Sequence, residues 1–327
     1  MNVLVTGGMG FIGANFIKHI IDKNEVKSVF NIDCPSRTSA AANKSNTAEF
    51  EKHPKYSFKD VWLEYFDNPI NLKEFRSLFE AFQIDTIVHF AAESHVDNSI
   101  RGPRQFVLSN IIGTFNLLEL CRNRYPKTRF HHISTDEVYG ALGENGSFTE
   151  ETPYDPSSPY SATKASSDHL VRSYFRTFNL PVTVSNCSNN YGPKQHDEKL
   201  IPTIVRSIIQ NKKIPVYGNG SNVRDWLYVE DHCEAIWNIL QKGKLGESYN
   251  VGGNCEKRNL EVIKEICRQM NVKSEDFIEF VEDRKGHDYR YSIDNSKYLS
   301  NIGEKAKTSF EEGISKTLTF YKDKYSI

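Results

Sequence analysis

The chain lacks several features that would mark a special environment. Its six cysteines are scattered along 327 residues without a Cys-x-x-Cys pair, so zinc spacing and a disulfide framework are both absent. No apolar run approaches the roughly 18 residues that a transmembrane helix requires. The apolar start of the chain meets glycines within a few residues, which is too short for a secretory signal. These absences predict a cytoplasmic protein without a metal site.

A strong charge of either sign is also missing. The 41 lysines and arginines nearly balance the 42 aspartates and glutamates, for a formal net charge of −1. A balanced chain has no overall field that would attract nucleic acid or an anionic membrane. Internal repeats and low-complexity tracts are absent too. With 38% hydrophobic residues, the chain can bury a substantial core. We therefore expect a globular protein that acts on a small molecule.

Short apolar runs alternate with helical patterns through the first two-thirds of the chain. Helical spacing of apolar residues predicts helices over 14–23, 106–124 and 160–178. Continuously apolar runs predict strands near 3–5, 29–33, 86–90, 130–134 and 182–185. Such strands suit a parallel sheet that is covered on both faces. The predicted fold class is α/β, a Rossmann-type doubly wound parallel sheet.

The composition changes after residue 190. Prolines punctuate the chain, and Gly218-Asn219-Gly220 is a turn signal. The sequence predicts a Rossmann domain over 1–190 that returns near 228–255, and a smaller mixed α/β substrate domain over 191–327, interleaved with the first. A strand near 249–251 and a helix over 260–270 would belong to this half. The polar segment 34–59 fits either a long loop or a short helix.

A glycine-rich turn lies between the first predicted strand and its helix. It reads Thr-Gly-Gly-Met-Gly-Phe-Ile-Gly over residues 6–13. Glycines 7, 10 and 13 allow a tight turn, close approach of the backbone to a pyrophosphate, and close packing of helix on strand. Asp33 follows twenty residues after Gly13, where a carboxylate binds the adenosine ribose and favours NAD over NADP. The guanidinium of the nearby Arg37 can receive a 2′-phosphate, so the residues leave NADP open as an alternative cofactor.

Tyr160 and Lys164 are spaced i, i+4 at the start of a predicted helix, after Pro159. That spacing places both side chains on one helix face. An ammonium beside a phenol stabilises the phenolate and lowers the phenol pKa, so the tyrosine can remove a hydroxyl proton near neutral pH. The matching reaction is hydride transfer to a nicotinamide. Taken alone, the pair would equally fit a surface helix.

Two adjacent carboxyl groups, Asp136 and Glu137, follow Thr135 at the end of the strand 130–134. Ligands bind at the carboxyl ends of the strands in open α/β sheets. Two neighbouring carboxyls resist double ionisation, so such a site favours one protonated and one charged group. A general acid and a general base of this kind are what removal of water from neighbouring carbons requires.

These motifs resemble the extended short-chain dehydrogenase/reductase family, and within it the dTDP-glucose 4,6-dehydratases. The Thr-Asp-Glu triplet is the specific part, since epimerases and decarboxylases of the family usually lack the Asp-Glu pair. The resemblance covers about 1–33 and 84–295. It is carried by the glycine turn, the Tyr-Ser-Ala-Thr-Lys helix, and the stretches His89–His95, Ser134–Gly140, Asn186–Pro193, Glu198–Pro202 and Val223–His232.

The resemblance implies a role for each catalytic residue. Tyr160 would deprotonate the sugar 4-hydroxyl while NAD takes the C4 hydride, and Lys164 would hold the nicotinamide ribose. Thr135 would hydrogen-bond the 4-oxygen. Glu137 would remove the C5 proton that the new ketone acidifies, and Asp136 would protonate the departing 6-hydroxyl. The hydride then returns to C6, so the implied enzyme is an NAD-dependent hydro-lyase of deoxysugar biosynthesis.

The resemblance also implies two sets of binding residues. The NAD site would contain Gly7, Gly10, Phe11, Ile12, Gly13, Asp33, Asp60, Ala91, Ala92, Ser109, Tyr160, Lys164 and Asn190. The nucleotide-sugar site would contain Ser94, Thr135, Asn189, Lys199, Leu200, Pro215, Tyr217, Arg224, Asn259, His287 and Tyr291. Arg224 suits a pyrophosphate best, because a guanidinium presents a fork of donors. A homodimer is expected from the same resemblance.

The chain departs from the family on the adenosine side. The family usually follows the Asp33 position with Leu-Thr-Tyr-Ala-Gly-Asn, whereas this chain reads Cys-Pro-Ser-Arg-Thr over 34–38. The expected Gly-Asp-Ile is replaced by the segment 58–62, from which Asp60 is assigned to the adenosine pocket. Asn98 stands where the family usually has arginine. The adenosine pocket is therefore expected to be built differently.

Other functions remain open from the residues. The same elimination on UDP-glucose or another nucleotide hexose needs the same catalytic groups. A 4-epimerase would leave the Asp136–Glu137 pair without a task. A catalytically silent NAD-binding regulator of this fold would bind the cofactor without turnover.

Overall fold

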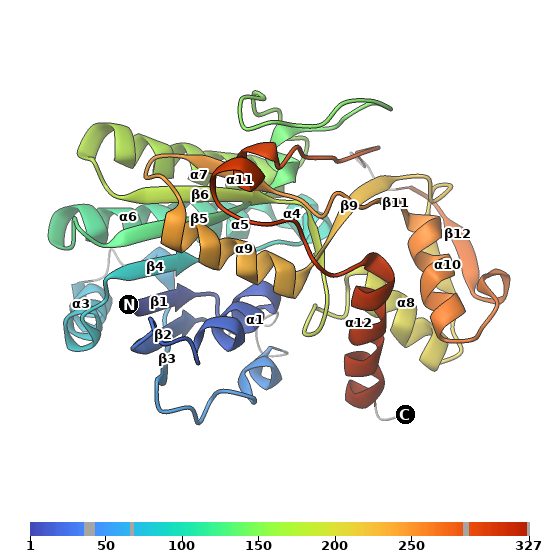
Figure 1. The fold of residues 1–327 in the computed structure, drawn as a ribbon, viewed down its shortest axis with the longest axis horizontal. Helices are drawn as coiled ribbons and strands as arrows, with labels where there is room; N and C mark the ends of the chain where they lie inside the picture. The colour runs from blue at the N-terminus through green and yellow to red at the C-terminus, as the bar shows by residue number, and fades with distance from the viewer. Residues whose placement is uncertain (36–42, 66–68, 284–287, 326–327) are drawn as a thin grey trace.

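The structure is a computed structural model that describes residues 1–35, 43–65, 69–283 and 288–325. Within these residues, seven strands form one parallel sheet (Figure 1). The order across the sheet is β10 (Ser248–Val251), β6 (Val182–Cys187), β5 (Arg129–Thr135), β4 (Thr86–His89), β1 (Asn2–Thr6), β2 (Ser28–Asp33) and β3 (Tyr56–Asp60). The chain winds in opposite directions from β1, toward β2 on one side and β4 on the other. That reversal opens a crevice at the carboxyl ends of the strands.

Helices cover both faces of this sheet. Val3 and Val5 of β1 pack into one hydrophobic cluster and Leu4 into the other, as alternate residues of a strand must. One face is covered by α1 (Phe11–Ile20) and α9 (Val229–Lys242). The other face is covered by α3 (Pro69–Phe82), α6 (Gly113–Arg124) and α7 (Pro159–Phe178). The central strands β1, β4 and β5 are accordingly buried along nearly their whole length.

Shorter elements connect these layers. After β4 the chain forms α4 (Val96–Arg101) and α5 (Pro103–Phe106), followed by the π-helical turn η3 (Val107–Ile112), which leads directly into α6. The described residues also form four 3-10 helices, η1 (Lys44–Thr47), η2 (Leu63–Tyr65), η4 (Asp136–Tyr139) and η5 (Ser274–Asp276).

A second group of elements gathers at one end of the molecule, where Figure 1 shows α8, α10 and α12 together. Its strands form a small sheet of β11 (Glu256–Arg258), β9 (Val223–Tyr228) and β7 (Asn189–Tyr191), and a pair of β12 (Ile278–Val281) and β8 (Ile214–Tyr217). Its helices are α8 (Leu200–Ile209), α10 (Asn259–Gln269) and α12 (Phe310–Lys324), which share one apolar core. Between them the chain returns to the large sheet through α9 and β10, against which α11 (Ser296–Asn301) packs.

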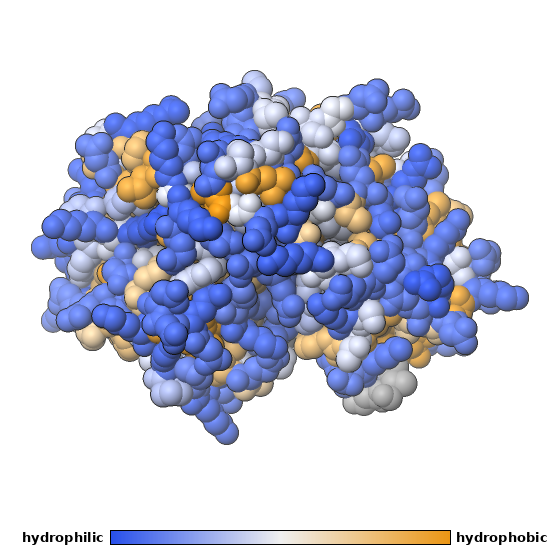
Figure 2. All heavy atoms as spheres, in the orientation of Figure 1, coloured by the Kyte–Doolittle hydropathy of each residue, from blue (hydrophilic) through white to orange (hydrophobic). Residues whose placement is uncertain are grey.

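The predicted fold class is confirmed. Each of the predicted strands and helices named above has a counterpart within a few residues of its expected bounds. The sequence did not predict β3, because this edge strand is only partly buried and carries no continuous apolar run. Figure 2 shows a mostly polar surface on the viewed face, with apolar residues scattered in small groups. None of the helices among the described residues is both long and apolar enough to cross a membrane.

Candidate active site

A cleft of about 330 Å³ opens at the carboxyl ends of β1, β2, β4, β5 and β6. The glycine turn after β1 and Asp33 of β2 lie on one side of it, and Thr135 of β5 and Cys187 of β6 lie on the other. The cleft therefore brings together the two groups of residues that the sequence singles out, the phosphate-binding turn and the acid–base residues. This is the position at which open α/β sheets bind ligands.

The glycine turn has no space for side chains. Gly7 has a positive φ of +72°, and a Cβ there would lie 2.8 Å from the backbone of Ala91. A Cβ on Gly13 would lie 2.3 Å from the carbonyl oxygen of Gly7. The backbone thus forms a close cradle, and the first turn of α1, capped by Gly10, offers its amide N–H groups to it. These residues fit the pyrophosphate of a dinucleotide.

Asp33 is tied to the same turn. Its Oδ2 accepts a hydrogen bond of 2.8 Å from the amide of Met9, and its Oδ1 accepts one of 2.8 Å from the amide of Cys34. The buried side chain of Asn46, on η1, donates to the carbonyl of Met9 at 3.0 Å. The segment after β2 therefore braces the turn from outside. Arg37 lies outside the described residues, so the structure does not test whether it would receive the 2′-phosphate of NADP.

Tyr160 and Lys164 lie on the first turns of α7, which begins with Pro159 after a capping box of Ser158 and Ser161. Both side chains are buried and line the cleft. The Lys164 ammonium donates to the carbonyl of Ile133 at 2.8 Å and contacts Nε2 of His132 at 3.3 Å. Burial lowers the pKa of Lys164, while the carboxylate of Asp168 opposes that shift.

The pKa of Tyr160 corrects one prediction. The spacing of Tyr160 and Lys164 predicts a lowered phenol pKa, but in the structure this pKa is raised well above its usual value. Burial is the largest cause, and the neighbouring Glu137 carboxylate adds to it. A hydrogen bond with Thr135 acts in the opposite direction. The prediction failed because spacing on a helix does not reveal how deeply the phenol is buried.

Asp136 and Glu137 form the start of η4, which Thr135 caps by accepting a hydrogen bond of 3.3 Å from the amide of Glu137. Asp136 is only 1% exposed, and burial raises its pKa well above the usual range, with the charges of Glu137 and Asp225 next in effect. Its Oδ2 has no hydrogen-bond partner among the described residues. Asp136 is thus a neutral carboxylic acid, as the sequence predicts for one of the two groups.

The π-helical turn η3 shapes one wall of the cleft. It turns the buried Asn110 so that its side chain clamps Glu93, accepting from the amide at 2.8 Å and donating to the carbonyl at 3.0 Å. Asn110 also donates to Thr163 of α7 at 2.9 Å. This contact holds the segment after β4 against the catalytic helix. Ser109, the preceding residue, lines the cleft. Single π-helical turns are frequent at functional sites.

The structure places most of the predicted cofactor residues in the cleft. Those that line it are Gly7, Gly10, Phe11, Ile12, Gly13, Asp33, Ala91, Ala92, Ser109, Tyr160, Lys164 and Asn190. Asp60 does not line this cleft; it lines a separate pocket with Trp62, Phe75 and Leu78. It ends β3, where it is the register partner of Asp33 on the neighbouring strand. Its assignment to the adenosine pocket therefore stays a prediction.

The predicted substrate residues divide into two groups. Ser94, Thr135, Asn189 and Lys199 line the cleft. Leu200, Pro215, Tyr217, Arg224, Asn259 and Tyr291 lie on α8, β8, β9, α10 and the segment after β12, beyond the residues that line the cleft. His287 lies outside the described residues.

Arg224 and Tyr291 nevertheless lie close to the catalytic pair. The Arg224 guanidinium stacks on the Tyr291 ring at 4.4 Å and donates to the carbonyl of Asp288 at 3.0 Å. Its charge acts to lower the pKa of Asp136, and the charge of Glu137 acts to raise the pKa of Tyr291. The Arg224 guanidinium is therefore close enough to Asp136 for its charge to act on the pKa of that acid.

Sequence reasoning missed polar residues beneath the cleft. His132 and Asp168 are fully buried, and both contact the surroundings of Lys164. A signal was present for each: His132 is a polar residue in a strand covered on both faces, and Asp168 is one helical turn beyond Lys164. Further residues that line the cleft without having been predicted are Cys34, Asn43, Phe90, Glu93, Ile133, Ser134, Cys187, Ser188 and Gln195.

Comparison with known proteins gives a consistent result. The model of the family described as GDP-mannose 4,6 dehydratase matches residues 4–317. A dTDP-glucose 4,6-dehydratase from Haemophilus influenzae is 47% identical over 98% of this chain and 98% of its own length. The crystal structure of a dTDP-glucose 4,6-dehydratase from Bacillus anthracis in complex with NAD superposes with a TM-score of 0.88. It is 42% identical and covers 99% of this chain and 97% of the other.

A protein of a different activity shares the fold equally well. The UDP-glucuronic acid 4-epimerase from Bacillus cereus, solved with UDP-glucuronic acid and NAD, superposes with a TM-score of 0.90. Its sequence is 26% identical, with 99% of this chain and 100% of the other covered. Backbone similarity alone does not separate dehydratase from epimerase, whereas sequence identity does, at 42–47% with the dehydratases and 26% with the epimerase.

Proposed function

The chain belongs to the dTDP-glucose 4,6-dehydratase family, and we propose that it converts dTDP-glucose to dTDP-4-dehydro-6-deoxyglucose by NAD-dependent removal of water. The observation that carries this proposal is the buried, neutral Asp136 beside Glu137 at the edge of the cleft. A hydride-transfer enzyme of this fold needs Tyr160 and Lys164, but only an elimination also needs a second acid and base. The arrangement provides both.

The first part of the reaction takes place at the sugar C4. NAD, when bound in the cleft, accepts the C4 hydride and later returns it to C6. Tyr160 takes the proton of the 4-hydroxyl in its phenolate form, which the hydrogen bond from Thr135 favours and burial opposes. Lys164, which lines the floor of the cleft, would hold the nicotinamide ribose. Burial of these groups excludes water and strengthens their interactions with the substrate.

The second part removes water across C5 and C6. Oxidation at C4 makes the neighbouring C5 proton acidic, and Glu137 removes it. Asp136 gives its proton to the 6-hydroxyl, which leaves as water. Asp136 suits this task because burial keeps it protonated at neutral pH. Glu137 returns its proton to C5 when the hydride reaches C6. The proton that Tyr160 took from the 4-hydroxyl replaces the one that Asp136 gave to the leaving water, so all groups regain their starting state.

Mass spectrometry of the products provides the test. Incubation of the purified protein with dTDP-glucose should yield a product lighter by one water, without any external reductant. Glu137→Gln should lower the rate of water loss about a thousandfold, because a positioned general base contributes 10²–10⁴-fold. The variant should still bind NAD, since Glu137 lies away from the glycine turn. A wild-type protein that exchanges the C4 configuration and releases no water would overturn the proposal.

The second group of elements would bind the nucleotide part of the substrate. We propose that residues 191–327, apart from the return near 228–255, form the substrate domain and that Lys199 and Arg224 bind the diphosphate. Lys199 lies at the start of α8, where its ammonium contacts the carbonyl of Ser94 at 3.2 Å across the cleft. Side-by-side turnover of dTDP-glucose and UDP-glucose decides which base is preferred.

We also propose that the protein is a cytoplasmic homodimer. Ile100 on α4, Val107 on η3 and Phe115 on α6 are all at least 40% exposed, which is unusual for large apolar residues along neighbouring helices. A second copy of the chain would cover them. Sedimentation should show a dimer that Phe115→Glu dissociates and that Phe280→Glu, an exposed residue on β12, leaves intact. The six cysteines are all free, which agrees with a reducing compartment.

A further inference from the structure

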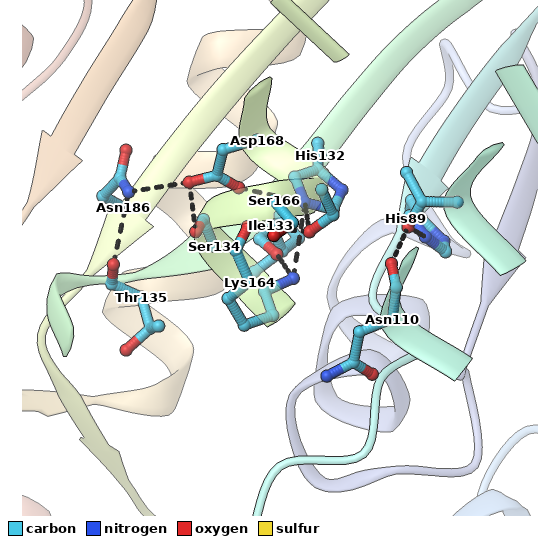
Figure 3. A network of polar contacts seen from close by, with 12 residues as sticks. His89, Asn110, His132, Ile133, Ser134, Thr135, Lys164, Ser166, Asp168 and Asn186 are labelled. Atoms are coloured by element: carbon cyan, nitrogen blue, oxygen red, sulfur yellow. Dashed lines mark hydrogen bonds and ion pairs between the residues drawn. The ribbon is translucent and has the colours of Figure 1, made fainter. Parts of the chain in front are cut away.

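A chain of buried polar side chains runs from the floor of the cleft into the core. Figure 3 shows Lys164, His132 and Asp168 linked in sequence, with Ser134 and Asn186 on the far side of the carboxylate. Lys164 is 4% exposed, His132 1% and Asp168 0%. Burying a charge is costly unless an opposite charge or several hydrogen bonds compensate. The arrangement around Asp168 therefore requires a physical explanation.

His132 stands between the two charges. Its Nε2 lies 3.3 Å from the Lys164 Nζ and 3.2 Å from the Asp168 Oδ1. The hydroxyl of Ser167 lies 3.3 Å from the same nitrogen. Its Nδ1 has no hydrogen-bond partner among the described residues. Every polar contact of this ring that the structure shows is thus made through the one nitrogen that faces both Lys164 and Asp168.

Asp168 is held as a carboxylate. Its Oδ2 accepts hydrogen bonds from the Ser134 hydroxyl at 2.7 Å, the Tyr154 hydroxyl at 2.9 Å and the Asn186 amide at 3.4 Å. These donors occupy Oδ2, whereas Oδ1 makes no hydrogen bond among the described residues and lies 3.2 Å from Nε2 of His132. The pKa of Asp168 is lowered despite its burial, because His132, Lys164 and Ser134 all favour the charged form. A negative charge therefore lies beneath the lysine.

The imidazole between the charges is neutral. Burial lowers the pKa of His132 to about 4, and the Lys164 charge lowers it further. The other ionisable groups that face Lys164 are His89 of β4 and Cys187 of β6, both buried, together with Tyr160 on its own helix. His89 is neutral, because burial lowers its pKa, and Cys187 is neutral, because burial raises its pKa to about 12. Asp168 is the carboxylate that offsets the buried ammonium.

The three groups share one face of α7. Tyr160, Lys164 and Asp168 are spaced i, i+4 and i+8, so they lie above one another along the helix. The phenol and the ammonium face the cleft, and the carboxylate lies one turn deeper. One helix thus presents the proton acceptor, the cation and the counter-charge in a line.

We propose that Asp168, acting through His132, is a positioning residue that holds the Lys164 ammonium in its buried place at the floor of the cleft. The inference deepens the proposed function, on which its catalytic meaning rests. A lysine that lost this counter-charge would shed its proton more readily, so the floor of the cleft would lose its buried cation at a lower pH. The effect would appear in how activity depends on pH, more than in substrate binding.

Asp168→Asn provides the main test, because it removes the charge and keeps the shape. In the NAD-bound enzyme, the alkaline limb of the pH profile of kcat should move about one unit lower, since loss of an opposite charge lowers a lysine pKa by about that much. KM should stay within about twofold, since Asp168 does not line the cleft. The Lys164 signal in protein labelled with ¹³C at the lysine ε-carbon should titrate at a correspondingly lower pH. Equal titration in Asp168→Asn and the wild type would overturn the proposal.

Tyr154→Phe serves as the matched control. It removes a hydrogen bond to the same carboxylate without removing the charge, so Lys164 should titrate as in the wild type. If Asp168→Asn fails to fold, as judged by circular dichroism, a pair of His132 variants takes its place. His132→Gln keeps an acceptor near the position of Nε2, whereas His132→Leu removes it. The glutamine should restore the wild-type titration that the leucine shifts, and identical behaviour of the two would contradict the inference.

The ¹³C titration also separates this inference from the proposed function. It observes Lys164 directly and needs no turnover. If the wild-type protein removed no water from dTDP-glucose, the proposed function would fail while the titration could still show the coupling of Lys164 to Asp168. If the wild-type protein removed water from dTDP-glucose but Lys164 titrated equally in Asp168→Asn and the wild type, only the positioning role would fail.

Discussion

The carboxyl ends of β5 and β2 face the same cleft but are built in different ways. At the end of β5, Thr135 and Asp136 are buried, and the neighbouring helices of the fold itself surround them. At the end of β2, Asp33 is half-buried and held by backbone amides, and η1 braces the adjacent turn from outside. The end of β5 is thus part of the core, whereas the end of β2 depends on an added segment.

This difference explains which parts of the site follow the family and which do not. A buried acid such as Asp136 has its pKa set by many packed neighbours, so little can change around it without loss of function. The adenosine side needs only hydrogen bonds to ribose and a surface for the base. Different segments can supply these; here Asn46 of η1 braces the glycine turn and Asn43 lines the cleft.

The largest expected effect is at the end of β5. Asp136→Asn keeps the shape of the side chain and cannot give a proton to the leaving hydroxyl, so kcat should fall about a thousandfold. Because the protonated form is the active one and burial raises its pKa, wild-type kcat should fall as pH rises through that raised pKa. The variant should lack this limb. Asp155→Asn, an exposed carboxylate nearby, should leave kcat unchanged, and an equal loss there would contradict the assignment.

Acid should destabilise the β5 side next. His131 of β5 is fully buried, and burial lowers its pKa well below the unfolded value of about 6.5. Below that value the unfolded chain binds more protons than the folded one, so the free energy of unfolding falls as pH decreases. The cost is roughly 1–3 kcal/mol for each such histidine. Denaturant unfolding at pH 7 and pH 5 should show a smaller decrease in His131→Gln than in the wild type.

The contrast between the ends of β5 and β2 also explains which features the sequence could predict. The strands β1, β2, β4, β5 and β6 and the helices α1 and α7 follow from apolar runs and helical spacing, which are local signals. Thr135–Glu137 and Tyr160–Lys164 could be placed at one cleft because the ends of parallel strands share an edge. The edge strand β3 was missed, since an exposed strand needs no continuous apolar run.

Other features depend on contacts between distant segments. The link from Lys164 through His132 to Asp168 needs the position of α7 over β5, which no spacing along the chain encodes. The raised pKa of Tyr160 depends on burial in the same way. The position of Asp60 beside Asp33 likewise depends on the pairing of β3 with β2, which the sequence did not predict.

A smaller effect is expected at the end of β2. Asp33→Asn keeps an acceptor for the amide of Met9 but loses the charge that binds the ribose, so NAD affinity should fall about tenfold. Preference for NAD over NADP should narrow, because the repulsion of a 2′-phosphate is lost. Calorimetry with both cofactors measures this. Asp60→Asn on the neighbouring strand should leave the affinities for NAD and NADP unchanged, because Asp60 does not line the cleft. A lower affinity in this variant would support the predicted place of Asp60 in the adenosine pocket.

The smallest effect should come from the brace itself. Asn46→Ala removes the donor to the buried carbonyl of Met9, which costs about 1 kcal/mol in the free energy of unfolding. NAD affinity should fall only a few-fold, and kcat at saturating NAD should not change, because Asn46 is remote from η4. Ser45→Ala, exposed on the same 3-10 helix, is the control and should match the wild type. If Asn46→Ala lowered kcat at saturating NAD, the segment that braces the end of β2 would affect the chemistry at the end of β5. The two strand ends would then not be independent of each other, as we infer that they are.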